Sequence, residues 1–258
     1  MTNIENTILP AAALRDIFKQ TLAPTIPTDP TTSLYRWTLL LGVVVSMVAW
    51  WRLAKTDRRL IPVYAGALAG AFTGAKLVYI LAEGWLHIGH PDFWTQLATG
   101  KTITGALLGG YLGVEITKHL VGYTSPTGDR FAIIAPVAIA IGRVGCLTHG
   151  CCPGEPCDAN RWYALTDAAG TSRWPAVPIE LAFNIAFIPV ALALTRARAL
   201  PGQHFHLYLI AYGTFRFAHE FARATPKIIF GLSGYHIAAL ALTTLGICRF
   251  LSRRSTTN

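Results

Sequence analysis

Charged side chains are scarce in this chain, and acidic ones are the scarcest. Only 14% of the 258 residues are Asp, Glu, Lys or Arg, and only 13 are acidic. A soluble domain usually carries about 25% charged residues. Here 52% of the residues are hydrophobic, and the mean hydropathy is +0.42. The composition therefore excludes an ordinary soluble domain and indicates that most of the chain lies in a membrane.

The shortage of acidic residues leaves a net charge of +9. Such an excess suits either nucleic acid or anionic lipid headgroups. In a chain this apolar we expect membrane lipid as the partner and no nucleic acid. The first thirty-odd residues also lack a long apolar core and contain Glu5, Arg15 and Asp16, so we expect no cleavable signal peptide.

Seven apolar stretches are about long enough to cross a bilayer as helices. The second contains Gly66, Gly70 and Gly74, a spacing that lets helices pack backbone to backbone. We therefore predict an all-α polytopic membrane protein with about seven transmembrane helices around a lipid-binding cavity. The predicted spans are residues 34–51, 60–81, 102–117, 131–147, 178–194, 205–222 and 234–251.

The connections between the spans differ in positive charge. One alternate set carries eleven lysines and arginines, whereas the other carries eight although it is more than twice as long. The denser set is expected to face the cytoplasm, which places the N-terminus outside and the C-terminus inside. We predict an N-terminal periplasmic surface segment over 1–33, one transmembrane domain over 34–258, and an outward-facing loop over 148–177.

Arg143 lies at the end of an apolar run, between Gly142 and Gly145. An intramembrane guanidinium is costly and marks a candidate functional site, although an arginine there can also snorkel to the interface. No acidic residue lies close to it in sequence. Its planar fork suits a lipid phosphate, and its replacement is expected to spare the fold because a desolvation cost is relieved.

Arg216 and Glu220 lie four residues apart in the sixth span and can pair on one helix face. A structural ion pair alone would explain them, but together with Arg143 they favour a phospholipid site. Lys76, inside the second span, either turns toward the bundle interior or snorkels to the interface.

Four of the five cysteines lie within residues 146–157. Zinc binding by these cysteines and His149 fits poorly, because adjacent Cys151 and Cys152 cannot form a Cys-x-x-Cys pair, so we expect no metal. On an oxidising face we expect Cys157 to pair with Cys151 or Cys152. If one of the thiols is catalytic, His149 is the nearest base.

Three segments resemble signature segments of the prolipoprotein diacylglyceryl transferase family. They are residues 104–110 (TGALLGG), 142–154 (GRVGCLTHGCCPG) and 212–223 (YGTFRFAHEFAR), with a weaker match at 74–76 (GAK). The resemblance covers most of the chain, from the first span to the end.

This resemblance implies transfer of a diacylglyceryl group from phosphatidylglycerol to the lipobox cysteine thiol of a lipoprotein precursor. The reaction would release glycerol phosphate at the outer face of the bacterial inner membrane, without a cofactor. Carried over by position, the catalytic residues are Arg143, Arg216, Glu220 and His149, and the substrate-binding residues are Arg143, Arg216, Tyr212, Lys76, Thr104, Gly105, Cys146, Gly154 and Arg223.

The chain departs from the family pattern at several positions. Thr104 stands where many members have histidine, and Cys146 and His149 stand where many have asparagine. The base for the acceptor thiol would then be His149, His219 or none. The alternatives are a divergent paralogue that uses the same donor with another acceptor, or a non-catalytic lipid-binding or transport protein.

Overall fold

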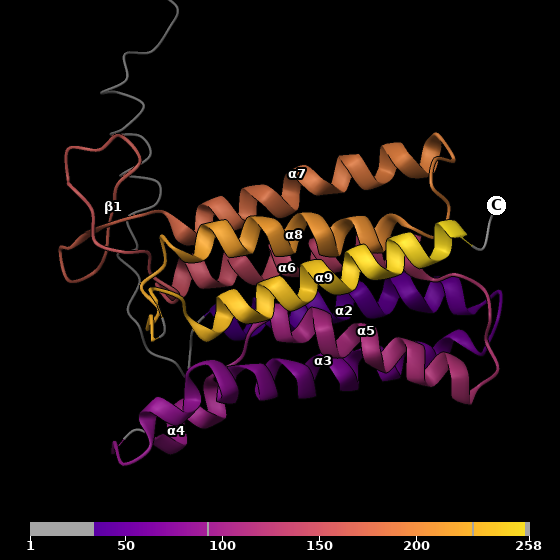
Figure 1. Ribbon diagram of the computed structural model, residues 1–258, viewed down its shortest axis with the longest axis horizontal. Helices are drawn as coiled ribbons and strands as arrows, with labels where there is room; N and C mark the ends of the chain where they lie inside the picture. Colours follow the sequence, from indigo (N-terminus) through magenta and orange to yellow (C-terminus); the bar gives the residue numbers. More distant parts are fainter. Residues whose placement is uncertain (1–33, 92, 229, 256–258) are drawn as a thin grey trace, which may run out of the picture.

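Seven long helices run side by side through residues 34–91, 93–228 and 230–255, which are the parts of the chain that the computed structural model describes (Figure 1). Each coincides with one predicted span, so the all-α class is confirmed. The predicted surface segment, 1–33, lies outside the described residues. The helices are α2 Leu34–Ala54, α3 Leu60–Ala82, α5 Ile103–Leu120, α6 Gly128–His149, α7 Ala176–Arg196, α8 His204–Glu220 and α9 Gly234–Ser255.

Five of these helices, α2, α3, α6, α7 and α9, are long and apolar enough to cross a membrane. The other two are shorter: α5 has 18 residues and α8 has 17. Both carry charged side chains toward their C-terminal ends, which lowers their hydropathy. They nevertheless pack along the spans, α5 against α3 and α8 against α9 (Figure 1). The chain is a multi-pass membrane protein.

The short elements gather at one end of the bundle, on the left in Figure 1. They are the 3-10 helix η1 Gly84–His87, helix α4 Phe93–Thr99, and the antiparallel pair β1 Leu165–Thr166 and β2 Ser172–Arg173. Asp167 closes the turn between the strands: its carboxylate accepts from the Thr171 N–H at 2.9 Å and from Arg173 Nε at 2.5 Å. The hydrogen bond from Arg173 is the main reason that the pKa of Asp167 lies below its usual range, and the Thr171 N–H adds to the effect.

The outer surface of the bundle is apolar. Phe72, Leu112 and Ile237 are 70%, 55% and 62% exposed. Large apolar side chains at such exposure suit contact with lipid tails, while each helix satisfies its own backbone hydrogen bonds. The interior holds an aromatic cluster that includes Tyr111, Phe205, Tyr208 and Tyr212. The hydroxyl groups of Tyr208 and Tyr212 donate hydrogen bonds to buried polar side chains of α7.

Helices α3 and α5 lie in backbone contact, as the glycine spacing predicts. A Cβ atom at Gly70 would lie 2.2 Å from the Gly109 carbonyl oxygen, and one at Gly74 would lie 2.3 Å from that of Gly105. Neither approach leaves room for a side chain. The third-span glycines therefore fix the position of α5 against α3.

Replacing Gly109 with alanine is expected to lower the free energy of unfolding by about 1–3 kcal/mol, because the new methyl group forces the two backbones apart. The matched control is Gly110→Ala, whose Cβ would meet its nearest atom at an ordinary 3.5 Å. Thermal unfolding in detergent would compare the two proteins. Equal destabilisation by both changes would contradict the close-contact interpretation.

Candidate active site

Most of the candidate site residues lie at the end of the bundle that carries the short elements. The C-terminal end of α6, the N-terminal end of α7 and the C-terminal end of α8 all meet there (Figure 1). Five charged side chains from these elements are buried, with exposures of 0–6%. They are Arg143, Glu180, Arg216, Glu220 and Arg223.

Arg143 on α6 pairs with Glu180 on α7. The guanidinium Nη2 lies 2.8 Å from both carboxylate oxygens of Glu180. Tyr212 on α8 donates its hydroxyl to Glu180 Oε1 at 2.6 Å. Glu180 is therefore the acidic partner that the sequence near Arg143 lacks. It lies 37 residues after Arg143 in the sequence.

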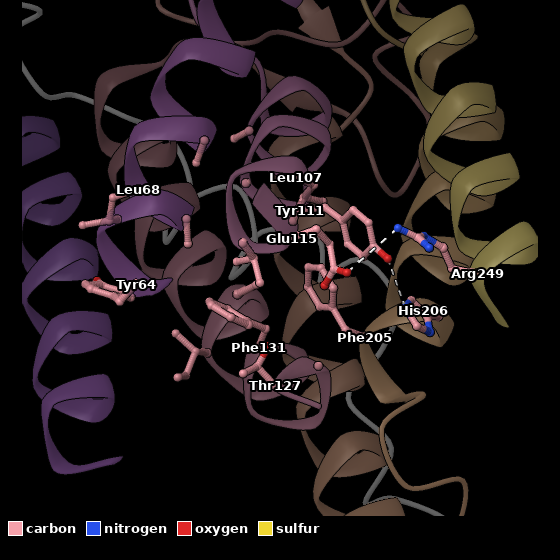
Figure 2. A pocket seen from close by; sticks show the side chains of 18 of the residues that line it. Tyr64, Leu68, Leu107, Tyr111, Glu115, Thr127, Phe131, Phe205, His206 and Arg249 are labelled. Carbon is pink, nitrogen blue, oxygen red and sulfur yellow. Dashed lines mark hydrogen bonds and ion pairs between the residues drawn. The ribbon is translucent and has the colours of Figure 1, made fainter. Parts of the chain in front are cut away.

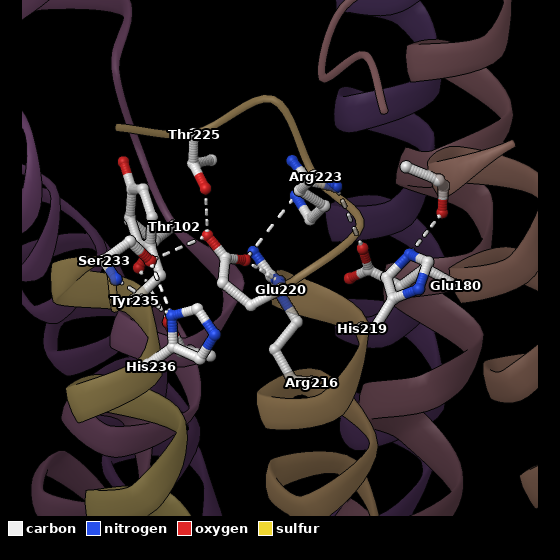
Figure 3. Close-up of polar contacts among 12 residues, drawn as sticks. Thr102, Glu180, Arg216, His219, Glu220, Arg223, Thr225, Ser233, Tyr235 and His236 are labelled. Carbon is white, nitrogen blue, oxygen red and sulfur yellow. Dashed lines mark hydrogen bonds and ion pairs between the residues drawn. The ribbon is translucent and has the colours of Figure 1, made fainter. Parts of the chain in front are cut away.

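A second pair lies on α8 alone. Arg216 and Glu220 are in direct contact, as their spacing predicts. Glu220 Oε1 also accepts hydrogen bonds from Thr225 Oγ1 at 2.5 Å and from Ser233 Oγ at 3.0 Å, and Ser233 is in turn bonded to His236 Nδ1 (Figure 3). The carboxylate of Glu220 is thus held by α8 and by the 221–233 connection that follows it.

Arg223 lies between Glu180 and Glu220 (Figure 3). Its Nη1 is 3.7 Å from Glu180 Oε2, and its Nε is 3.8 Å from Glu220 Oε2. Both nitrogens are buried and have no hydrogen-bond partner among the described residues. Buried donors normally have partners, so Arg223 has two donors to offer to an anionic ligand.

The backbone around Gly154 positions Arg223. Gly154 pairs with Arg223 in an antiparallel bridge, flanked by the hydrogen bonds Glu155 N–H to Ala222 O at 2.9 Å and Ala224 N–H to Pro153 O at 3.2 Å. A Cβ at Gly154 would lie 2.2 Å from the carbonyl oxygen of Trp174. Gly154 therefore joins the 148–177 loop to the end of α8.

The buried network carries an excess of positive charge. Three guanidinium groups face two carboxylates within it. Burying a net charge is costly unless a counter-charge is close. The network is therefore complementary to one anionic group.

Three thiols converge next to Arg143. The Sγ atoms of Cys146, Cys151 and Cys152 lie within 4.8 Å of one another, and Arg143 Nη1 is 3.7 Å from Cys146 Sγ. Gly150 and Cys152 both adopt the left-handed conformation, with φ of 69° and 62°. This double reversal ends α6 and folds both adjacent cysteines back toward Cys146.

Every described cysteine is free, and Cys157 lies apart from the three clustered thiols. Its N–H donates to the carbonyl oxygen of Ser172 at 2.9 Å, which fixes it beside β2. The predicted pairing of Cys157 with Cys151 or Cys152 is therefore wrong. Hydrogen bonds from Cys146 and Cys151, reinforced by the charges of Arg143 and Arg223, hold the pKa of the Cys152 thiol well below its usual range.

The two histidines proposed as bases make their contacts outside the five buried charges, and His149 Nδ1 has no hydrogen-bond partner among the described residues. His149 stacks on Tyr35, with ring centroids 5.2 Å apart. His219 Nε2 contacts the Ala176 carbonyl oxygen at 3.0 Å, and its ring stacks on Phe215. Neither imidazole is hydrogen-bonded to the five buried charges.

Three further predicted substrate-binding residues, Lys76, Thr104 and Gly105, make their hydrogen bonds to groups other than the five buried charges. Lys76 Nζ contacts the carbonyl oxygens of Leu97 and Ala98 at the end of α4, so it stabilises that helix terminus. Thr104 is buried beside Thr102, with 3.3 Å between their hydroxyls. The Gly105 N–H donates to Thr102 Oγ1 at 2.8 Å, which caps α5.

Sequence reasoning did not assign a role to Glu180, Thr225 or Ser233. Glu180 is an acidic residue near the start of an apolar span, and the cost of burying its charge marks it as a candidate in the same way as Arg143. Thr225 and Ser233 are ordinary loop residues in the sequence, and no local pattern relates them to Glu220.

A cavity of about 450 Å³ lies between α3, α5, α6, α8 and α9, and none of the five buried charges lines it (Figure 2). Its walls are mostly apolar, and Ile139, one helical turn before Arg143, is part of them. Charged and polar residues lie at the far end: Arg249 is 3.9 Å from Glu115, and Tyr111 is 3.5 Å from His206. The volume is within the range of about 300–1,000 Å³ that is typical of ligand pockets.

Comparison with known proteins adds a family to this geometry. The family model for prolipoprotein diacylglyceryl transferase matches residues 27–252. Relatives named phosphatidylglycerol–prolipoprotein diacylglyceryl transferase include that of Dehalococcoides mccartyi, 26% identical over 82% of this chain and 85% of its own length. The relative from Symbiobacterium thermophilum is 28% identical over 82% of this chain and 86% of its own length. The relative from Neisseria meningitidis serogroup B is 26% identical over 71% of this chain and 76% of its own length.

Proposed function

This chain belongs to the prolipoprotein diacylglyceryl transferase family and is a transferase, and we propose that it transfers a diacylglyceryl group from phosphatidylglycerol to the lipobox cysteine thiol of a lipoprotein precursor. The observation that carries the proposal is the buried network of three arginines and two glutamates, in which Arg223 has two donors without a partner among the described residues.

The phosphodiester of the donor lipid is an anionic partner for the two Arg223 donors that have no partner among the described residues. Guanidinium groups bind phosphate oxygens through charge-assisted hydrogen bonds, and Arg223 has two donors, Nε and Nη1, without a partner among the described residues. Arg143 and Arg216 contribute positive charge from either side, each oriented by a buried carboxylate. Glu180 and Glu220 therefore position the arginines and do not themselves contact the lipid.

The apolar cavity is suited to the acyl chains of the donor. Its lining residue Ile139 lies one helical turn from Arg143, so the acyl chains of a lipid held at the arginines by its phosphate would extend toward the cavity. The outer surface of the bundle is apolar, as contact with lipid tails requires.

In the reaction, the acceptor sulfur forms a bond to the glyceryl carbon while the bond between that carbon and the phosphate oxygen breaks. The electron pair stays on the phosphate, so glycerol phosphate leaves with one more negative charge than the diester had. Fixed cations at that phosphate stabilise the charge as it develops and lower the barrier. The thiol proton leaves to water.

The test uses purified protein, phosphatidylglycerol labelled in its terminal glycerol, and a lipobox peptide. We expect release of labelled glycerol phosphate that requires the peptide, and a peptide mass increased by one diacylglyceryl group. A peptide with serine in place of the lipobox cysteine is the control. Release without peptide modification would show that another acceptor is used, and no release would contradict the enzyme assignment.

We also propose that the protein lies in the bacterial inner membrane with its N-terminus outside and its C-terminus in the cytoplasm. A phosphatase reporter that is active only outside the cytoplasm should then be active when inserted at the exposed turn near Asp167 and inactive when fused after Asn258. The reverse pattern would contradict this orientation and would place the charged network on the cytoplasmic side.

A further inference from the structure

The cluster of Cys146, Cys151 and Cys152, here called the thiol triad, has no role in binding the lipid phosphate. Its three sulfur atoms come from the last turn of α6 and the reversal that follows, and they converge within 4.8 Å. We propose that the thiol triad binds one thiophilic divalent cation, Zn²⁺ in the first instance, with a fourth position open for the acceptor thiol.

The spacing of the sulfur atoms fits such an ion. Zinc–sulfur bonds are about 2.3 Å, which places sulfur ligands of a tetrahedral site about 3.8 Å apart. The triad approaches this spacing without a change of fold. The sequence argument against zinc assumed a Cys-x-x-Cys pair. The left-handed Gly150 and Cys152 instead let two adjacent cysteines reach one point.

The charges around the triad favour the metal-bound form. Three thiolates and one divalent cation carry a net charge of −1, and Arg143 Nη1 lies 3.7 Å from Cys146 Sγ. Soft thiolate ligands select zinc over magnesium or calcium. A zinc site with three protein ligands and one open position is typical of catalytic rather than structural zinc.

The triad also borders a second cavity of about 90 Å³, lined by Gly154, Trp174 and Pro178 among others. If the proposed function holds, the acceptor cysteine enters here and its sulfur becomes the fourth ligand. A metal-bound thiol loses its proton, here to water, and the resulting thiolate lies next to the arginine that faces the lipid phosphate. His149 stacks on Tyr35 and His219 contacts a backbone carbonyl oxygen, so in this proposal the metal, and not an imidazole, activates the acceptor thiol.

Metal binding is tested on the full-length protein, purified in detergent with its thiols reduced. Titration with Co²⁺ should give one equivalent of bound metal and a thiolate-to-cobalt charge-transfer band, which Zn²⁺ should abolish by displacement. Cys151→Ser and Cys152→Ser should lose the band. Cys157→Ser and Cys248→Ser, which change cysteines outside the triad, should keep it.

Absence of the band from reduced wild-type protein, or an unchanged band in both triad variants, would overturn the site. A disulfide between two triad cysteines in protein isolated from membranes would overturn it as well.

The role of the metal is tested separately. Removal of zinc should abolish modification of the lipobox peptide, and zinc should restore it. Metal binding without any release of glycerol phosphate would refute the proposed function and leave the site intact, whereas full turnover after metal removal would refute only the role in thiol activation.

Discussion

Arg223→Ala is expected to lower turnover of phosphatidylglycerol by about 10²–10³-fold, the loss seen when one positioned donor to a developing negative charge is removed. Arg223 has two buried donors without a partner among the described residues, and its distances to the two glutamates, 3.7 and 3.8 Å, are long. The folded state therefore depends little on it. Steady-state release of glycerol phosphate, measured beside thermal unfolding, would show loss of turnover with little loss of stability.

Two further variants make this result specific. Arg223→Lys keeps the positive charge but loses the planar guanidinium group with its several donors, so it should retain only part of the activity. Arg161→Ala changes an exposed arginine of the 148–177 loop and should leave turnover unchanged. If Arg223→Ala turned over at the wild-type rate, Arg223 would not contact the phosphate.

Arg143→Ala is expected to act first on the fold. Glu180 is fully buried, and removing its partner leaves a carboxylate without its main counter-charge. Breaking a buried ion pair on one side costs about 3–5 kcal/mol. From the sequence alone, loss of Arg143 is expected to spare the fold because it relieves a desolvation cost. The buried pairing with Glu180 leads to the opposite expectation, a loss of stability. Detergent-stable yield and thermal unfolding would measure the effect.

The double variant Arg143→Met with Glu180→Gln separates stability from activity. It replaces both charges, so it should recover much of the stability that Arg143→Ala loses. It should not recover turnover, because the cation beside the phosphate remains absent. A double variant with wild-type turnover would refute a role for Arg143 at the phosphate, and an Arg143→Ala protein as stable as the wild type would refute its pairing with Glu180.

The sequence by itself determined the class of protein and the region of its site. Low charge and long apolar stretches require lipid around the helices, and all seven predicted spans coincide with helices. Arg143, Arg216 and Glu220 were identifiable because charge inside an apolar span is costly wherever the span packs. The Arg216–Glu220 contact and the close approach of α3 and α5 follow from helical periodicity, which is a local property.

Only the tertiary structure decided how these residues combine. Glu180 pairs with Arg143 because α6 and α7 are neighbours, and no spacing within either helix encodes that neighbourhood. Arg223 reaches the network because the backbone at Gly154 holds it there, and Lys76 lies outside it because α4 folds back over α3. The thiol triad depends on two left-handed residues at one turn. Side-chain pairing across helices depends on which helix faces meet, so a single sequence gives the charges but leaves their partners open.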